Sequence, residues 1–469
     1  MLEKNQVFET QIIDNGYQGE GIAKIDNFPI FVPGGIKGEE VEIKILKVLS
    51  NYAYGKITRI IKPSEHRREA DCKEFPKCGG CNLRHMDYNY TLALKKANVE
   101  NCLYKALNRK IKVNDVIGME KPMHYRNKLQ FPVGEDSNGN MVMGVYSERT
   151  HNIVPVQNCY IQNEECNKIA NDVLEFLKTN KTSAYNEATL KGTVRHIIVR
   201  MGIKTHESLV TIVVNDNGLK NEKELVEFLK TKYPCIKTIV KNYNTKNTNV
   251  ILGDKTEVIY GDGYIYDILC GYKFKISPLS FYQVNPIQTE ILYNTAIKFA
   301  TNDTNETAKT IALDLYCGIG TIGICSAKHF KKIYGIEIVK QAIDDAKENA
   351  KLNNLQNTEF YAGDVEEVLP EILEDIENKP ETVFVDPPRK GLDNKTIDVL
   401  KNLRPKTIVY VSCNPATLAR DLKLLEEKYE IKEIQPVDMF PYTSHVECCA
   451  LLCLKFWCNS QINVLIRYK

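Results

Sequence analysis

The chain has 469 residues, enough for roughly three domains, and its formal net charge at neutral pH is only +2. Any surface that binds nucleic acid must therefore be a local basic patch. No apolar run approaches the length of a membrane-spanning helix, and no secretion signal opens the chain, so we expect a cytoplasmic monomer with no membrane partner. In that compartment the 15 cysteines are expected to be thiols, metal ligands or catalytic groups.

Residues 1–63 alternate short apolar segments with glycines, which predicts a small β-barrel. Between residues 37 and 68, eight Lys or Arg stand against four Glu, with Tyr52 and Tyr54 interleaved. This pattern suits an oligonucleotide-binding barrel, although an ordinary solvated β-surface has it too. The strands are expected at residues 7–13, 20–25, 28–32, 40–48 and 53–61.

Residues 64–275 are expected to form a central α+β domain. It opens with a cysteine motif in which Cys72, Cys78 and Cys81 follow the spacing C-x5-C-x2-C, with two glycines that let the chain wrap a metal. Cys159 is the preferred fourth ligand, ahead of two other cysteines, Cys102 and Cys166. Four thiolates fit either an iron–sulfur cluster or structural zinc, and the spacing does not decide between them.

The rest of the central domain contains helices and strands but little readable chemistry. Helices are expected at residues 88–107, 164–179 and 221–232. Strands are expected from residue 125 and at residues 195–201, 209–214, 238–242 and 266–274.

Residues 276–469 repeat strand and helix, which predicts a doubly wound α/β sheet. Such a sheet binds its ligand outside the carboxyl ends of its strands. The strands are expected at residues 310–315, 332–338, 358–361, 382–385, 407–412, 431–438 and 447–454.

A glycine-rich turn follows the first of these strands and indicates a nucleotide-like cofactor. Asp314 opens it and could pair with an amino-acid ammonium, while Gly318 lets a ligand approach the backbone. Glu337 ends the second strand, where an acid can bind a ribose diol, and Asp364 after the third could hold an adenine amino group. Residues 318–323 alone also fit the dinucleotide spacing, so the preference for S-adenosylmethionine over NAD depends on the later motifs.

Cys413 stands where a buried strand ends and a helix, expected at residues 416–427, begins. The helix dipole should lower the pKa of the thiol and favour the thiolate, as a nucleophile requires. For this cysteine alone, a half-buried structural role is the alternative.

The ordered motifs together resemble the RNA uracil-C5 methyltransferase family over almost the whole chain. They are F-x-Q-x-N at 281–285, DLYCGIG, GIE, DPPRKG, SCNPATLARD and DMFPYTSHVE. The front half resembles the ribosomal-RNA branch, which implies an N-terminal TRAM domain, a [4Fe-4S] cluster and large-subunit (23S) rRNA as substrate. A tRNA substrate is the alternative.

The resemblance implies a role for individual residues. It gives contacts with S-adenosylmethionine to Gln283, Tyr316, Glu337 and Asp386. It assigns the role of nucleophile to Cys413 and that of general base to Glu447. The chemistry independently requires a thiolate to add to carbon 6 of uracil and a base to remove the proton from carbon 5.

Three other functions remain to be weighed. Cytosine-directed enzymes carry a cysteine after the proline of the fourth strand, where this chain has Pro388 and Arg389. An amino-group methyltransferase would need no cysteine adduct and usually has an aromatic residue in place of Arg389. A non-catalytic RNA-binding iron–sulfur protein with a degenerate methyltransferase fold would not need Cys413, Glu447 and Gln283 intact.

Overall fold

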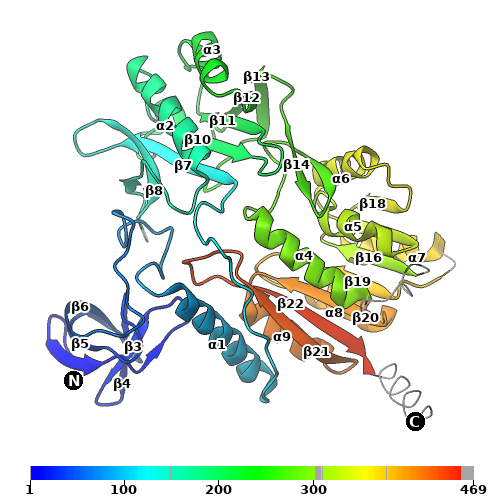
Figure 1. Ribbon diagram of the computed structural model, residues 1–469, viewed down its shortest axis with the longest axis horizontal. Helices are drawn as coiled ribbons and strands as arrows, with labels where there is room; N and C mark the ends of the chain where they lie inside the picture. The colour runs from blue at the N-terminus through cyan, green and yellow to red at the C-terminus, as the bar shows by residue number, and fades with distance from the viewer. Residues whose placement is uncertain (1, 148–149, 302–307, 309, 376–377, 456–469) are drawn as a thin grey trace.

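The computed structural model describes residues 2–147, 150–301, 308, 310–375 and 378–455, so residues 456–469 of the expected C-terminal domain lie outside it. Figure 1 shows a blue barrel, a cyan-to-green sheet with helices packed against it, and a yellow-to-red sheet between layers of helices. The expected fold class, a barrel and an α+β region beside a doubly wound sheet, is confirmed. No helix within the described segments is long and apolar enough to cross a bilayer.

The N-terminal barrel closes because its first two strands, which are consecutive in the chain, pair with different parts of the sheet. β1 pairs with β5, whereas β2 pairs with β3. Between them, Ile12 N–H bonds the carbonyl of Glu39 and Ile13 N–H that of Ile22, both at 2.8 Å. The barrel comprises β1 (Val7–Gln11), β2 (Asp14–Asn15), β3 (Gly21–Ile25), β4 (Phe28–Val32), β5 (Glu40–Val48) and β6 (Ala53–Lys62).

The central unit is a seven-stranded sheet of order β13-β12-β11-β10-β7-β8-β9. Its buried apolar side chains pack against α2 (Glu164–Thr179) and α3 (Glu222–Lys232). The strands are β7 (Lys128–Glu135), β8 (Met141–Tyr146), β9 (Ile153–Pro155), β10 (Val194–Met201), β11 (Ser208–Val214), β12 (Ile236–Tyr243) and β13 (Lys255–Tyr260).

The single strand expected at residues 266–274 is instead a hairpin of β14 (Ile265–Leu269) and β15 (Tyr272–Ile276). Its turn consists of Cys270 and Gly271, which have φ values of 50° and 84°. Two consecutive residues with positive φ make a tight hairpin turn whose twist matches that of the strands. Gly271 was therefore the sequence feature that should have divided this segment.

The C-terminal unit is a seven-stranded sheet of order β18-β17-β16-β19-β20-β22-β21. Its first five strands in this order are parallel, and β22 runs antiparallel between β20 and β21. The strands are β16 (Ile311–Leu315), β17 (Lys332–Glu337), β18 (Thr358–Ala362), β19 (Thr382–Val385), β20 (Thr407–Ser412), β21 (Tyr429–Val437) and β22 (Glu447–Leu454).

Helices cover both faces of this sheet and bury two apolar cores. α4 (Pro286–Thr301), α5 (Thr321–Ser326) and α6 (Lys340–Leu352) bury one face. The other face is covered by α7 (Val365–Asp375), α8 (Asn394–Leu403) and α9 (Pro415–Leu425). α1 (Tyr88–Leu107) also joins this second core, although it belongs to the segment expected as the central domain. Figure 1 shows α1 beside α9.

Candidate active site

The candidate site residues follow one edge of the C-terminal sheet in the order of its strands. Parallel strands bring their carboxyl ends to the same edge, and an antiparallel neighbour begins there. Along that edge, strand order therefore places Asp364, Glu337, Gly318, Asp386, Cys413 and Glu447 after or at the ends of β18, β17, β16, β19, β20 and β22. The expected cofactor residues occupy one half of the edge and the expected catalytic pair the other.

Cys413 lies between the end of β20 and the start of α9 and is half-buried. Asn414 caps the helix, because its side chain accepts the N–H of Ala416 at 3.0 Å. The Asn414 amide also donates to the carbonyl of Arg389 at 3.2 Å. The cap thus fixes the loop of Cys413 against the loop that follows β19.

The expectation of a lowered thiol pKa at Cys413 is wrong for the ligand-free protein. Burial raises the pKa of Cys413 to about 11, and the carboxylates of Glu447 and Asp386 add to the rise, while the Arg389 guanidinium opposes it. Desolvation and two nearby acids therefore outweigh the end of a helix. Positive charge brought to this edge by a ligand would favour the thiolate.

Glu447 faces Cys413 because of the register between β20 and β22. Ser412 is paired with Cys448 in these antiparallel strands, so the next position sets Cys413 opposite Glu447. Glu447 is only 4% exposed. Burial raises its pKa to about 8, with Asp386 adding to the rise and Arg389 opposing it. The expected rise toward the range of a general base is confirmed.

Arg389 is the cation that the sequence motif contained but to which no role was given. Its guanidinium lowers the pKa of Cys413, Glu447 and His445, although burial is the largest influence on each. Its motif, DPPRKG, directly follows β19. Arg389 therefore supplies positive charge to a site that contains the Cys413 thiol and the carboxyl groups of Glu447 and Asp386.

Asp314 holds the glycine turn instead of pointing a free carboxylate at a ligand. It is fully buried, and its Oδ2 accepts the N–H of Gly323 at 2.8 Å, while its Oδ1 has no hydrogen-bond partner among the described residues. Burial raises its pKa to about 7 despite that bond, and Asp386 and Glu337 add to the rise. The expected pairing with an ammonium would have to use Oδ1.

Glu337 and Gly318 are in direct contact. One carboxylate oxygen of Glu337 accepts the N–H of Gly318 at 3.2 Å and the other that of Val339 at 3.0 Å. Gly318 has a φ of 55°, and a Cβ there would meet nothing within 4 Å. The turn is therefore open on that side, as a loop that approaches a ligand requires.

The remaining expected cofactor residues lie around the same edge. The hydroxyl of Tyr316 is 3.0 Å from that of Thr396, and the residue has a φ of 63°. Gln283 is half-buried in the segment before α4, where its carbonyl accepts the side-chain amide of Asn127 at 3.1 Å. Burial alone raises the pKa of Asp386 to about 7.

The four expected cluster cysteines line one pocket of about 220 Å³, whereas Cys102 and Cys166 are not among its lining residues. Burial raises the pKa of Cys81 to about 12, with Cys159, Cys78 and Cys72 adding to the rise. Arg84 and Arg126 line the same pocket, and each has a buried guanidinium nitrogen without a partner among the described residues.

The arrangement of the four cysteines is not that of a site for a single metal ion. Within the described segments, no three His, Cys, Asp or Glu side chains are grouped so that they could hold a single metal ion. The pocket nevertheless collects four sulfur donors from two distant parts of the chain.

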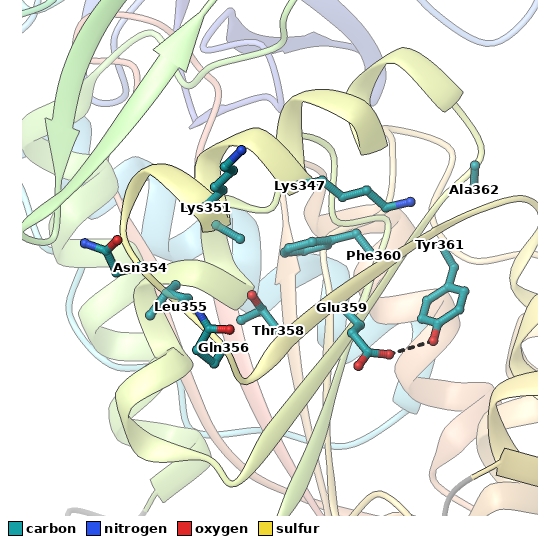
Figure 2. Close-up of a pocket in the computed structure, with 11 residues that line it drawn as sticks. Lys347, Lys351, Asn354, Leu355, Gln356, Thr358, Glu359, Phe360, Tyr361 and Ala362 are labelled. Atoms are coloured by element: carbon teal, nitrogen blue, oxygen red, sulfur yellow. Dashed lines mark hydrogen bonds between the residues drawn. The ribbon is translucent and has the colours of Figure 1, made fainter.

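A second pocket lies at the free edge of the sheet and contains none of the candidate site residues. Figure 2 shows Lys347 and Lys351 from α6 on one side of it and residues of β18 on the other. The Tyr361 hydroxyl donates to Glu359 at 2.8 Å there. With β18 at one end of the sheet and β20 separated from it by three strands, this pocket is not part of the Cys413 site.

Sequence reasoning missed a group of buried polar residues between α1 and the turn that leads into β22. Lys95 on α1 donates to Asp438 at 2.5 Å and to the Phe440 carbonyl at 3.1 Å. The Tyr88 hydroxyl donates to the other oxygen of Asp438 at 2.8 Å. A lysine in an amphipathic helix normally faces solvent, so the sequence contained no feature that would have identified this pair.

Comparison with known proteins supplies two family matches. A family model described as tRNA (Uracil-5-)-methyltransferase matches residues 87–455, and a TRAM domain model matches residues 2–58. The TRAM match covers most of the observed barrel.

Similar proteins extend over the whole chain. Uncharacterized RNA methyltransferases of Bacillus cereus and Clostridium acetobutylicum are each 45% identical over 96% of this chain and cover 97% and 98% of their own lengths. A solved structure of the Pyrococcus abyssi tRNA (uracil-54, C5)-methyltransferase in complex with S-adenosyl-L-homocysteine has a TM-score of 0.77 and 27% identity, over 95% of this chain and 100% of that one.

Proposed function

Because the chain belongs to the tRNA (uracil-5-)-methyltransferase family of S-adenosylmethionine-dependent RNA methyltransferases, we propose that it methylates carbon 5 of a uridine through a covalent adduct with Cys413. The observation that carries the proposal is the register that sets Cys413 opposite Glu447 at the carboxyl edge of the sheet. Further along the same edge, across β19, the N–H of Gly318 is bonded to the Glu337 carboxylate at 3.2 Å, which supports a cofactor site next to the proposed nucleophile and base.

The proposed steps use this chain's own groups. The Cys413 thiolate forms a bond to carbon 6 of uracil, which makes carbon 5 nucleophilic. Carbon 5 takes the methyl group that S-adenosylmethionine would supply, which leaves S-adenosylhomocysteine; until that transfer the positive sulfonium would favour the ionised forms of Cys413, Asp386 and Glu447. The Glu447 carboxylate then takes the proton from carbon 5, and the bond between carbon 6 and the Cys413 sulfur breaks to release the thiolate. Arg389 offsets the negative charge of the Cys413 thiolate and the Glu447 carboxylate.

RNA containing 5-fluorouridine tests the adduct, because fluorine replaces the proton that must leave. Wild-type protein should form a methylated covalent complex that survives denaturing gels, and Cys413→Ala should form none. Glu447→Gln should accumulate the complex with ordinary uridine RNA, with turnover reduced by about 100-fold or more. Adduct formation by Cys413→Ala would reject the assignment of the nucleophile.

For the substrate, we propose 23S rRNA, with tRNA as the second candidate. The similarity of the front half to the rRNA branch supports the first. The Pyrococcus abyssi tRNA enzyme supports the second, because it matches 95% of this chain, so that the domain order alone does not separate the two substrates. Methyl transfer to in vitro transcribed 23S rRNA and to tRNA, compared side by side, decides between them.

We also propose that Cys72, Cys78, Cys81 and Cys159 hold a [4Fe-4S] cluster. The four thiols around one pocket support it, as do the unpartnered guanidinium nitrogens of Arg84 and Arg126, which suit a negatively charged group. Zinc is the alternative, because four thiolates can also hold that ion. Protein purified without oxygen should contain about four irons per chain and absorb near 400 nm; stoichiometric zinc without iron would reject the cluster.

A further inference from the structure

The loop between β2 and β3 leaves the barrel and docks on the rest of the molecule. It is a tight turn, since Gly19 N–H bonds the carbonyl of Gly16 at 3.0 Å and Gly16 N–H that of Glu20 at 2.7 Å. A Cβ on Gly19 would lie 2.1 Å from the side chain of Leu83, so the loop is packed closely against the segment that follows the cysteine motif. Its conformation and its position are both constrained.

Asn82, the residue after Cys81, joins this loop to the turn that leads to Glu447. Its side-chain amide donates to the Gln18 carbonyl at 2.6 Å and to the Ser444 hydroxyl at 3.1 Å. Its side-chain oxygen accepts the N–H of Ser444 at 2.9 Å. In Figure 1 the red loop between β21 and β22 reaches from the sheet toward the blue segment of the chain.

Tyr17 stands at the tip of the docked loop and is 44% exposed. Burial of the rest of the ring raises the pKa of its phenol, and among its neighbours Cys102 and Cys413 add to the rise while Arg389 opposes it. The phenol is therefore within electrostatic reach of the nucleophile and of its cation. The neighbouring Gln18 is joined through Asn82 to Ser444, three residues before Glu447, so the hydrogen bonds also place this barrel loop beside the C-terminal site.

We propose that Tyr17 contacts the substrate, with its ring stacked on a nucleobase of the RNA strand that carries the target uridine. This inference rests on the proposed function and adds a residue from the barrel to its site. A uridine can reach Cys413 only if it leaves its stack, and its neighbours then lose a stacking partner. An exposed aromatic ring on a rigid loop replaces that partner at little entropic cost.

The alternative is that Tyr17 only packs against α1. Packing alone does not require the exposed part of the ring. If the ring only packs, its removal would change the stability and the cofactor affinity together. Stacking on RNA predicts a change confined to the RNA, and it predicts that the ring, not the hydroxyl, is required.

The test uses the full-length protein, methyl-labelled S-adenosylmethionine, and whichever of the in vitro transcribed 23S rRNA and tRNA the wild type methylates. Tyr17→Leu should raise the KM for that RNA by roughly 5-fold or more. It should leave the Kd for the cofactor and the midpoint of thermal unfolding unchanged. Tyr17→Phe should keep the wild-type KM. Tyr104→Leu, which replaces a similarly exposed tyrosine on α1, should also behave as wild type.

Three results would overturn the inference. One is a wild-type KM for Tyr17→Leu. Another is an equal loss in Tyr17→Phe, which would assign the effect to the hydroxyl. If Tyr17→Leu weakens cofactor binding and stability together with RNA binding, the residue is structural and the inference also fails. A wild-type protein that methylates neither RNA would instead reject the proposed function.

Discussion

The pKa of Cys413 is raised first by burial and then by Glu447, which begins the strand next to the one that Cys413 follows. With a Cys413 pKa near 11 and a Glu447 pKa near 8, the ligand-free site holds both protons at neutral pH. Deprotonation of Glu447 above pH 8 then makes thiolate formation harder. The neutral thiol is consequently the dominant form of Cys413 in the ligand-free protein.

Glu447→Gln should therefore make Cys413 more reactive in the ligand-free protein. Removing the carboxylate lowers the pKa of the thiol, so that iodoacetamide alkylation of Cys413 at about pH 9 should be roughly 3-fold faster or more. Mass spectrometry of the peptide containing Cys413 measures the rate. Glu430→Gln, at an exposed position on β21, should have no effect. Slower alkylation in Glu447→Gln would show that the carboxylate instead activates the thiol.

At the scale of elements, α1 holds the turn between β21 and β22 in place through a buried ion pair. Lys95 and Asp438 are 1% and 0% exposed in their side chains, so the ion pair is fully buried. Asn285 just before α4 adds a bond to the Met439 carbonyl at 3.0 Å. A helix outside the sheet therefore fixes the approach to Glu447.

Lys95→Met should destabilise the protein by about 3–5 kcal/mol, because it leaves the Asp438 carboxylate buried and unpaired. Urea denaturation measures the loss. The double variant Lys95→Met/Asp438→Asn should recover part of it, since the uncompensated charge is gone while one oxygen remains for Tyr88. A single variant as stable as the wild type would mean that solvent reaches Asp438.

The sequence predicted the elements of the C-terminal sheet well and its polar supports poorly. Buried strands such as β20 are continuous apolar runs, and the following Cys413, Asn414 and Pro415 mark the start of a helix. In contrast, Lys95 meets Asp438 across 343 residues, which no local pattern records. The prediction of a lowered pKa for Cys413 was wrong for the same reason, since its burial and its proximity to Glu447 and Asp386 arise only through the fold.

At the scale of the whole molecule, a buried carboxylate joins the barrel to the segment that follows it. Glu39 is 0% exposed and accepts two bonds from Arg67, at 2.5 and 2.7 Å, and one from the N–H of Ser64. Although burial raises the pKa of Glu39, these bonds lower it overall. A group with a lowered pKa stabilises the fold above its unfolded pKa, and this contribution is lost as the pH falls through the folded value.

Glu39→Gln should therefore cost about 3 kcal/mol at neutral pH and much less at an acidic pH below the lowered pKa of Glu39 in the folded protein. Urea denaturation at the two pH values measures the difference. Glu9→Gln removes an exposed partner of Arg59 and should change stability little at either pH. An equal loss by Glu39→Gln at both pH values would assign the effect to packing rather than to charge.

The position of β22 has a consequence for synthesis on the ribosome. β22 lies between β20 and β21, so β21 lacks its partner in the sheet until residues 447–454 have been made. The same segment supplies Glu447, and the turn before it completes the bond between Asn82 and Ser444. A chain that ends before residue 447 therefore lacks Glu447 and the partner of β21, even where the barrel, the cysteine pocket and the glycine turn are complete.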